Sequence, residues 1–280
     1  MKRLCLAAAA LFVSACATAQ TEDRDWRPVE AENLFLFELE AGEVAIELNP
    51  NFAPNHAARM RDLARAGVYD GERFYRVIEG FVAQGGVQQE ERMTDWPNLE
   101  NENDRPITED GFVPLGNGDL FASEVGHIGG FAVGRHQGFE REWLLHCPGA
   151  MAMARDVDPD TGGTEFYIVL DAHRYLDRNL TVFGRVIDGF EHIQALPRGD
   201  RAVENGVIQP PALGGLIVSA RMAADLPEED RPAYEVMRTD SAAFEGHKIG
   251  LRVRENEFFY RKPPEVLDIC AFSAPARKTG

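Results

Sequence analysis

Apolar and polar residues alternate along two neighbouring segments near the start of the chain, residues 34–39 and 43–48, with Ala41 and Gly42 between them. A period of two on both sides of a short turn predicts a β-hairpin. Segments rich in β-branched and aromatic residues predict further short strands at residues 74–78, 151–153, 166–170, 181–187 and 216–220. No internal repeat is found.

Two segments have the spacing of helices. Pro54 opens the first, at a position where its missing N–H costs nothing, and Ala57, Met60 and Leu63 then fall on one face. Residues 191–196 form the second, short helix, which Pro197 ends. Many short strands with two helices predict a mainly β fold, a closed antiparallel barrel capped by the helices.

Two further segments are not accounted for by such a barrel. Residues 87–146 form a connection that is too long to lack structure unless it has a function. In the C-terminal extension, residues 227–280, the segments 248–254 and 257–260 alternate around Asn256 and predict a hairpin. The extension contains too many apolar residues for a free tail, so we expect it to dock on the barrel.

The N-terminus has the pattern of an export signal, which we assign to residues 1–19. Lys2 and Arg3 precede an apolar run over residues 4–13, which is too short to span a membrane. We therefore expect an exported protein of the bacterial periplasm.

Two processing sites fit this signal. Residues 13–16 resemble a bacterial lipobox, which would place a lipid anchor on Cys16. Residues 17–19 resemble an ordinary signal-peptidase site, which would release a protein without an anchor. In either case residues 20–32 are polar enough to be a tether.

The composition fits a soluble globular chain of one domain with appendages. The 280 residues are 44% hydrophobic and 27% charged, and the formal net charge is −17. An acidic protein lacks the basic footprint that nucleic acids require, so we expect no nucleic-acid partner.

Two cysteines, Cys147 and Cys270, lie in the body of the chain. An oxidising compartment permits a disulfide between them. Two separate buried thiols, acting as small apolar groups, fit the sequence equally well.

Four segments follow one another in an order that indicates a shared groove. They are residues 74–86, 149–155, 162–170 and 175–186. One arginine stands among aromatic and aliphatic residues, with amide and carboxylate side chains nearby, which suits an apolar substrate with one polar peptide bond. These motifs resemble the cyclophilin family of peptidyl-prolyl cis-trans isomerases over residues 33–226. The resemblance implies the barrel fold and an isomerase that needs no cofactor.

The resemblance also implies how the reaction is catalysed. Rotation about a peptide bond meets a barrier of roughly 18–20 kcal/mol, because the nitrogen lone pair is delocalised into the carbonyl. A donor aimed at the prolyl nitrogen withdraws that lone pair and favours the twisted state. By its position in the motif, Arg76 is the expected donor, and Gln84 is expected to hold the substrate carbonyl and to brace the arginine.

Further positions match the family's substrate-binding residues. Phe81, Tyr167 and Leu176 are the expected walls of the proline pocket, beside Val82. The other matching positions are Ala154, Arg155, Glu165, Tyr175 and Leu180. Aromatic and aliphatic residues on strands are usually core residues, so these assignments depend on the resemblance.

Several of these positions depart from the family's usual residues. Arg155 stands where asparagine is frequent, and Glu165 where glutamine is frequent. Val82, Tyr175 and Leu180 replace a frequent methionine, tryptophan and histidine. The departures spare the arginine and the glutamine, and they are expected to alter peptide preference.

Metal chemistry finds no support in the sequence. His127, His136, His146 and Cys147 lie close together in the chain, but their spacings fit no zinc pattern, and scattered loop histidines are the simpler interpretation. We therefore expect no metal site.

The sequence thus predicts a monomeric isomerase whose partners are proline-containing polypeptides. The alternative is a chaperone or scaffold module that holds proline segments with little catalysis. A ligand-carrying barrel is disfavoured, because a small barrel fills with its own side chains.

Overall fold

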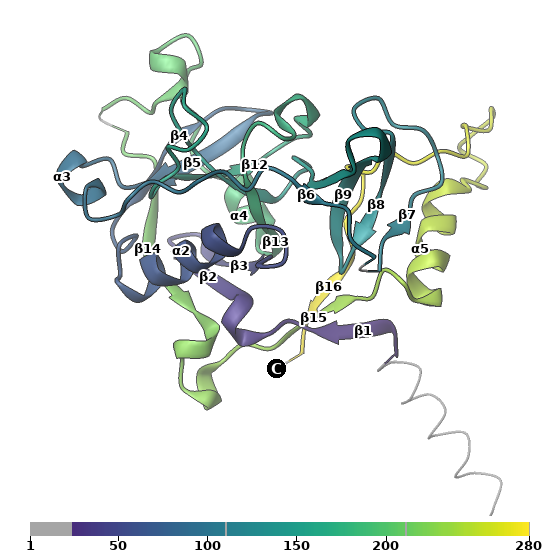
Figure 1. Ribbon diagram of the computed structural model, residues 1–280, viewed down its shortest axis with the longest axis horizontal. Helices are drawn as coiled ribbons and strands as arrows, with labels where there is room; N and C mark the ends of the chain where they lie inside the picture. The colour runs from purple at the N-terminus through teal and green to yellow at the C-terminus, as the bar shows by residue number, and fades with distance from the viewer. Residues whose placement is uncertain (1–23, 110, 211, 280) are drawn as a thin grey trace, which may run out of the picture.

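The computed structural model describes residues 24–109, 111–210 and 212–279. Eight strands close into a barrel in the order β11-β12-β5-β4-β14-β2-β3-β13 (Figure 1). Their bounds are β2 (Leu34–Leu39), β3 (Gly42–Leu48), β4 (Arg73–Val77), β5 (Val82–Gly86), β11 (Ala150–Met153), β12 (Phe166–Val169), β13 (Val182–Asp188) and β14 (Gly215–Met222). The predicted mainly β fold with a closed antiparallel barrel is confirmed.

The helices α2 (Pro54–Arg65) and α4 (Phe190–Gln194) lie where the sequence predicts them. Met60 and Leu63 on α2 are fully buried in the barrel core. The α4 helix packs on the β2–β3 hairpin, where a Cβ on Gly42 would overlap the His192 ring. Gly42 also has a φ of 145°, which residues with a side chain rarely adopt, so this turn favours glycine.

An aromatic cluster fills the barrel. Phe166 stacks on Phe37 with ring centroids 5.2 Å apart, and Phe74 and Tyr69 meet it edge-on at 5.5 and 5.3 Å. The Tyr69 hydroxyl donates to the Thr164 carbonyl at 2.8 Å, so the one polar atom in the cluster is satisfied. Truncation of such a buried ring typically costs about 3–5 kcal/mol of stability.

The long connection, residues 87–146, has a sheet of its own. Five strands pair in the order β6-β10-β9-β8-β7 and lie beside the barrel (Figure 1). They are β6 (Arg105–Pro106), β7 (Val113–Pro114), β8 (Glu124–Ile128), β9 (Phe131–His136) and β10 (Arg141–Leu144). We call residues 87–146 the insertion. The short helix α3 (Glu90–Met93) precedes this sheet.

A third sheet joins the two ends of the described chain. Its strands are β1 (Trp26–Pro28), β15 (Tyr234–Met237) and β16 (Ala276–Lys278), in the order β1-β15-β16. The prediction that residues 20–32 form only a tether is therefore wrong for residues 26–28. Their strand partner lies more than two hundred residues away, so no local pattern signals the pairing. The predicted signal and Cys16 lie outside the described residues.

The C-terminal extension packs on the rest of the molecule, with Tyr234, Val236 and Phe244 buried against strand β2 and Ala223. The hairpin predicted around Asn256 is wrong. Residues 242–252 form helix α5 (Ala242–Arg252), whose first turn is capped by the Ser241 hydroxyl accepting from the Phe244 N–H at 3.1 Å. Residues four positions apart lie on one face of a helix and also on one face of a strand. Apolar residues at that spacing in a short segment therefore fit both patterns.

Short 3₁₀ helices complete the chain. They are η1 (Ala31–Asn33), η2 (Gln137–Phe139), η3 (Arg174–Leu176), η4 (Glu204–Gly206), η5 (Ala223–Asp225) and η6 (Glu228–Asp230). Within the described ranges, no helix is long and apolar enough to cross a membrane. The same residues contain no cluster of three or more histidine, cysteine or acidic side chains that could hold a metal ion.

Cys147 and Cys270 form a disulfide with their Cα atoms 4.8 Å apart. Of the two alternatives that the sequence left open, the structure contains the bridge. It ties the C-terminal extension to the segment that connects the insertion to β11.

This arrangement predicts an unusual tryptic digest. Arg254 and Arg261 are exposed in a segment without regular structure, so trypsin is expected to cut after them first. The fragment that contains Cys270 should then stay attached through the disulfide, and gel electrophoresis should separate it only after reduction. Release of the fragment without reductant would contradict the bridge.

A chain that ends at Leu226 is expected to be less stable than the full chain. It lacks β15, β16 and α5, so it exposes the apolar side chains of Leu34 and Leu36 that the extension covers. Thermal unfolding of both forms measures the difference, and equal midpoints would show that the docking contributes no stability.

Candidate active site

Strand register brings the main candidate residues together. Arg76 on β4 lies opposite Gln84 on β5, Gln84 lies opposite Tyr167 on β12, and Tyr167 lies opposite Ala152 on β11. Directly paired residues project from the same face of a sheet. Their neighbours in the chain, which project from the other face, lie in the barrel core: Val77, Ala83, Ile168 and Met151. The row therefore lies on the outer face of the barrel.

Arg76 is held on two sides. Its Nη1 donates to Gln84 Oε1 at 2.9 Å, and its Nε donates to the Asn205 carbonyl at 2.8 Å. Nη2 of Arg76 has no hydrogen-bond partner in the described part of the chain, so it is available to a substrate. Burial lowers the pKa of Arg76 below its ordinary value, and the charge of nearby Arg201 acts in the same direction. The guanidinium nevertheless remains charged.

A compact polar network braces this arginine. Gln84 Nε2 donates to the Tyr75 hydroxyl and to Glu165 Oε2, both at 2.7 Å, and the Tyr75 hydroxyl donates to the same carboxylate oxygen at 2.5 Å. Burial raises the pKa of Tyr75, and the Glu165 charge raises it further, so the phenol stays a donor. Both N–H groups of the Gln84 amide are thus engaged, and its oxygen faces Arg76. The arrangement fits the bracing role expected for Gln84 better than a grip on the substrate carbonyl.

An apolar pocket adjoins the arginine. Phe81, Val82, Ala154, Tyr167 and Leu180 belong to one hydrophobic cluster, in which Val82 and Tyr167 are buried. The Phe81 ring lies 5.8 Å from the Arg76 guanidinium. A wall of apolar side chains with one cation at its rim fits a proline ring next to its polar peptide bond.

Three further predicted residues, Leu176, Tyr175 and Arg155, are not members of this cluster. Leu176 is half-buried in η3, and Tyr175 is 59% exposed with its ring edge-on to His173. Arg155 donates to the carbonyls of Asn179 and Asp156 at 2.7 and 2.6 Å, so its guanidinium is held along the chain.

A cavity of about 250 Å³ lies beside Gln84. The insertion contributes Met93, Trp96 and Asn98 to its lining, and the barrel contributes Arg155 and Glu165 among others. Sequence reasoning missed the insertion residues, because no local pattern shows that they reach the groove.

Two other residues at the site also escaped prediction. Asn205, which presents its carbonyl to Arg76, has a left-handed backbone with φ 54°, and the Asn-Gly pair at 205–206 is a turn signal visible in the sequence. His146, interpreted above as a scattered loop histidine, is fully buried and bonds to the Tyr167 hydroxyl across 2.9 Å.

Comparisons with known proteins agree with this geometry. The family model described as "Cyclophilin type peptidyl-prolyl cis-trans isomerase/CLD" matches residues 34–213. A "Probable peptidyl-prolyl cis-trans isomerase" of Brucella suis is 31% identical over 225 residues, which is 80% of this chain and 97% of the relative. "Peptidyl-prolyl cis-trans isomerase B" of Bacillus subtilis is 33% identical over 165 residues, which is 59% of this chain and 90% of the relative.

A solved structure extends the similarity beyond the barrel. The crystal structure of cyclophilin AquaCyp293 from Hirschia baltica superposes with a TM-score of 0.74 at 28% identity. The match covers 94% of this chain and 96% of that one, so it takes in most of the insertion and of the C-terminal extension. This chain belongs to the cyclophilin family and is a cyclophilin-type peptidyl-prolyl cis-trans isomerase.

Proposed function

We propose that Arg76 catalyses rotation about X–Pro bonds by donating from its guanidinium to the prolyl nitrogen. The observation that carries the proposal is the position of Arg76. It lies at the rim of the apolar pocket, is fixed by Gln84 and Asn205, and keeps Nη2 without a partner among the residues that the structure describes.

The chemistry requires little more than this donor. The prolyl nitrogen becomes a better acceptor as the bond twists, because its lone pair leaves the carbonyl. A donor already in place therefore stabilises the twisted state more than either planar state, and such differential stabilisation raises the rate. No covalent bond is made or broken.

The pocket residues have matching proposed roles. The proline ring lies against Phe81, Val82 and Tyr167, and the strand end at Ala154 and Arg155 runs alongside the substrate backbone. The cavity lined by Trp96 and Met93 accepts a residue before the proline. Glu165 acts indirectly, by holding Gln84.

The experiment that tests this proposal separates catalysis from binding. An Ala-Pro peptide is mixed with a hundredth of its concentration of protein, and cis-trans exchange is followed by NMR exchange spectroscopy. A catalyst accelerates exchange of the whole peptide pool. A chaperone or scaffold module would leave the exchange rate unchanged at this ratio, and that result would overturn the proposal.

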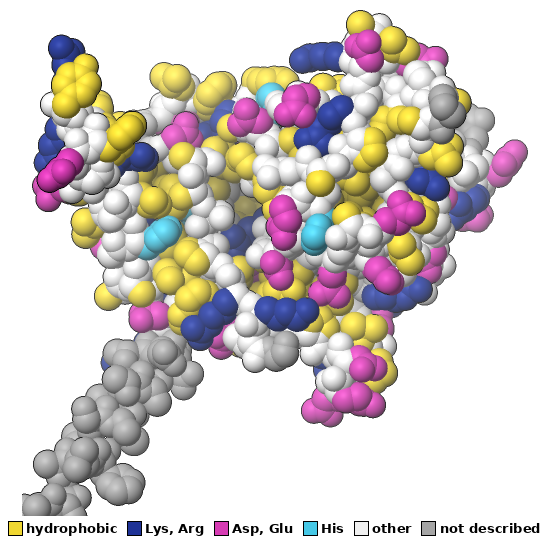
Figure 2. Space-filling view, turned by 180° about the vertical axis from the view of Figure 1, so that it is seen from behind, with side chains coloured by type: hydrophobic (Ala, Val, Ile, Leu, Met, Phe, Trp, Pro, Cys, Tyr) yellow, Lys and Arg dark blue, Asp and Glu magenta, His cyan; other side chains and the backbone are white. Residues whose placement is uncertain are grey.

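We further propose that the clients are exported proteins of the cell envelope, bound by a monomer. The signal-like N-terminus and the disulfide support an oxidising compartment. On the face seen in Figure 2, basic side chains are interspersed with acidic ones, which together with the net charge of −17 argues against nucleic acid. Mass spectrometry of the mature chain tests the processing: a lipidated Cys16 would show an anchor, and an N-terminal Gln20 a free protein.

Peptide preference should depend on the charge of residues next to the proline. Arg155 and Glu165 both line the cavity beside Gln84, where neutral amides are usual. In a series of peptides that differ only in flanking charge, we expect kcat/KM to vary several-fold at low salt. The variation should shrink at physiological ionic strength, where charges are screened over about 8 Å. Equal rates across the series at low salt would contradict this expectation.

A further inference from the structure

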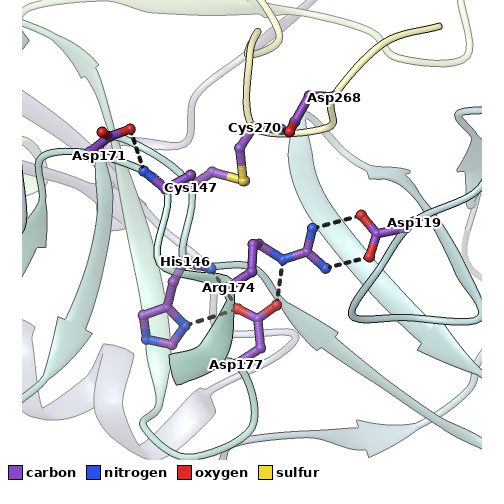
Figure 3. The surroundings of a disulfide bond; sticks show 9 residues. Asp119, His146, Cys147, Asp171, Arg174, Asp177, Asp268 and Cys270 are labelled. Atoms are coloured by element: carbon purple, nitrogen blue, oxygen red, sulfur yellow. Dashed lines mark hydrogen bonds and ion pairs between the residues drawn. A yellow bond between two sulfur atoms is a disulfide. The ribbon is translucent and has the colours of Figure 1, made fainter.

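A series of buried polar groups runs from Asp119 to the Tyr167 hydroxyl at the proline pocket. Figure 3 shows its members from Asp119 to His146. Asp119 in the insertion accepts from Arg174 Nη1 and Nη2 at 2.9 and 3.1 Å. Arg174 Nε donates to Asp177 Oδ2 at 2.5 Å, and Asp177 Oδ1 lies 3.1 Å from His146 Nδ1. His146 Nε2 in turn lies 2.9 Å from the Tyr167 hydroxyl.

The burial of this series shows that water does not compete for its bonds. The exposed fraction of the side chain is 0% for His146, 5% for Asp177, 7% for Arg174 and 13% for Asp119. Burying charged groups is costly unless each is paired and hydrogen-bonded. Here each member has its partners, which makes the series a single rigid unit.

His146 is also fixed through its backbone. Its N–H donates to Asp177 Oδ1 at 2.9 Å, and its carbonyl accepts from the His173 N–H at 3.0 Å. The next residue, Cys147, is tied to Cys270 by the disulfide (Figure 3). The ring is therefore held by the barrel on one side and by the C-terminal extension on the other.

The direction of each hydrogen bond follows from the acceptors. An ionised aspartate can only accept, so His146 Nδ1 carries the proton that faces Asp177. In the neutral ring Nε2 is then an acceptor, and the Tyr167 hydroxyl donates to it. Tyr167 is 5% exposed, so without this acceptor its hydroxyl would be buried without a partner.

We propose that His146 is a positioning residue of this isomerase, which sets the depth and tilt of the Tyr167 ring in the proline pocket and links it through Asp177 and Arg174 to Asp119, in another part of the insertion. The inference rests on the proposed function, because it takes Tyr167 as a wall of that pocket. Arg76 does not take part in the series, so loss of His146 should weaken substrate binding and leave the catalytic donor in place.

Two amide substitutions test which ring nitrogen matters. An asparagine amide reaches the place of Nδ1, and a glutamine amide reaches that of Nε2. His146→Gln keeps a partner for the Tyr167 hydroxyl, whereas His146→Asn removes it. We expect His146→Asn to raise KM about ten-fold with kcat within two-fold of wild type. His146→Gln should raise KM no more than about three-fold.

The Tyr167→Phe background shows whether the effect passes through the hydroxyl. There the difference in KM between His146→Asn and His146→Gln should vanish, because no hydroxyl remains to be satisfied. Equal KM values of the two variants in the Tyr167 protein would overturn the proposal. So would a difference that persists in the Tyr167→Phe background, because it would show a general structural effect.

Asp119, at the end of the polar series farthest from Tyr167, gives a test that does not disturb His146. Asp119→Asn should raise KM about three-fold in the Tyr167 protein and not in the Tyr167→Phe protein. Asp70→Asn is the matched control, since Asp70 pairs with Arg221 in another part of the barrel, and its KM should be unchanged. An unchanged KM in Asp119→Asn would overturn the link between His146 and Asp119. If an amide variant of His146 fails to fold, the Asp119→Asn result is the deciding test.

The proposed function and this inference can fail separately. If Arg76→Ala keeps its turnover, the catalytic assignment falls. If Arg76→Ala loses turnover while the two His146 variants behave alike, the assignment of Arg76 stands and only the positioning role of His146 falls.

Discussion

Replacing Arg76 by alanine is expected to lower kcat/KM for prolyl isomerisation by roughly 100-fold to 1000-fold, or about 2.7–4 kcal/mol, the effect typical of removing one aimed donor from an active site. The loss should fall mainly on kcat, because the donor acts on the twisted state and the apolar pocket remains. NMR exchange spectroscopy on an Ala-Pro peptide measures both parameters.

Arg73 provides the matched control for this substitution. It lies on the same strand, β4, and its Nη1 donates to the Gly214 carbonyl at 3.0 Å, away from Gln84. Arg73→Ala should leave kcat/KM within about two-fold of wild type. Arg76→Ala should fold normally, because the side chain is half-exposed and contributes little to the core. A folded Arg76→Ala protein with wild-type turnover would show that another group supplies the catalysis.

The barrel could be predicted because its signals are local. Strands β2 and β3 are mostly apolar and flank a two-residue turn, and α2 begins at a proline and buries Met60 and Leu63 on one face. Each of these patterns is complete within about a dozen residues. The sequence therefore contains them whether or not the partner strands are known.

The candidate site could be predicted only in part, because its residues come from different strands and are brought together by the pairing of those strands. Arg76 and Gln84 lie eight residues apart within one motif, so the sequence predicts both as site residues. The carbonyl of Asn205 reaches Arg76 from 129 residues away, and no pattern around Asn205 indicates that contact. His146 was missed for a related reason, since a buried histidine in a connection cannot be told from an exposed one by its neighbours.

The same reason explains the errors outside the barrel. Strand β1 pairs with β15, and the insertion forms its own sheet, from segments as short as two residues. Strands of that length carry too few side chains for a period to be recognised. The α5 segment is long enough to show a period, but its scattered apolar positions fit the period of a helix and that of a strand. Only the Ser241 cap favours the helix.

The insertion contains an ionic cluster around the buried Glu142. Glu142 is fully buried and accepts from Arg105 on one carboxylate oxygen and from Arg135 on the other, each at 2.7 Å. Each guanidinium also lies over an aromatic ring, Arg105 over Phe52 and Arg135 over Phe112, both at 3.8 Å. One fully buried carboxylate thus pairs with two guanidinium groups, of which Arg135 is buried and Arg105 partly buried.

Glu142→Ala should therefore destabilise the protein by about 3–5 kcal/mol, because it removes the anion that pairs with the buried Arg135 guanidinium and with the partly buried Arg105. Denaturant unfolding followed by tryptophan fluorescence measures this, since Trp143 is buried next to the cluster in the insertion's core. Asp240→Ala breaks an exposed pair with Arg238 and should cost no more than about 1 kcal/mol. If the two variants unfold at the same denaturant concentration, the buried cluster contributes no more than a surface pair. A large difference would instead show that the insertion is held together by charge pairing as well as by its apolar core.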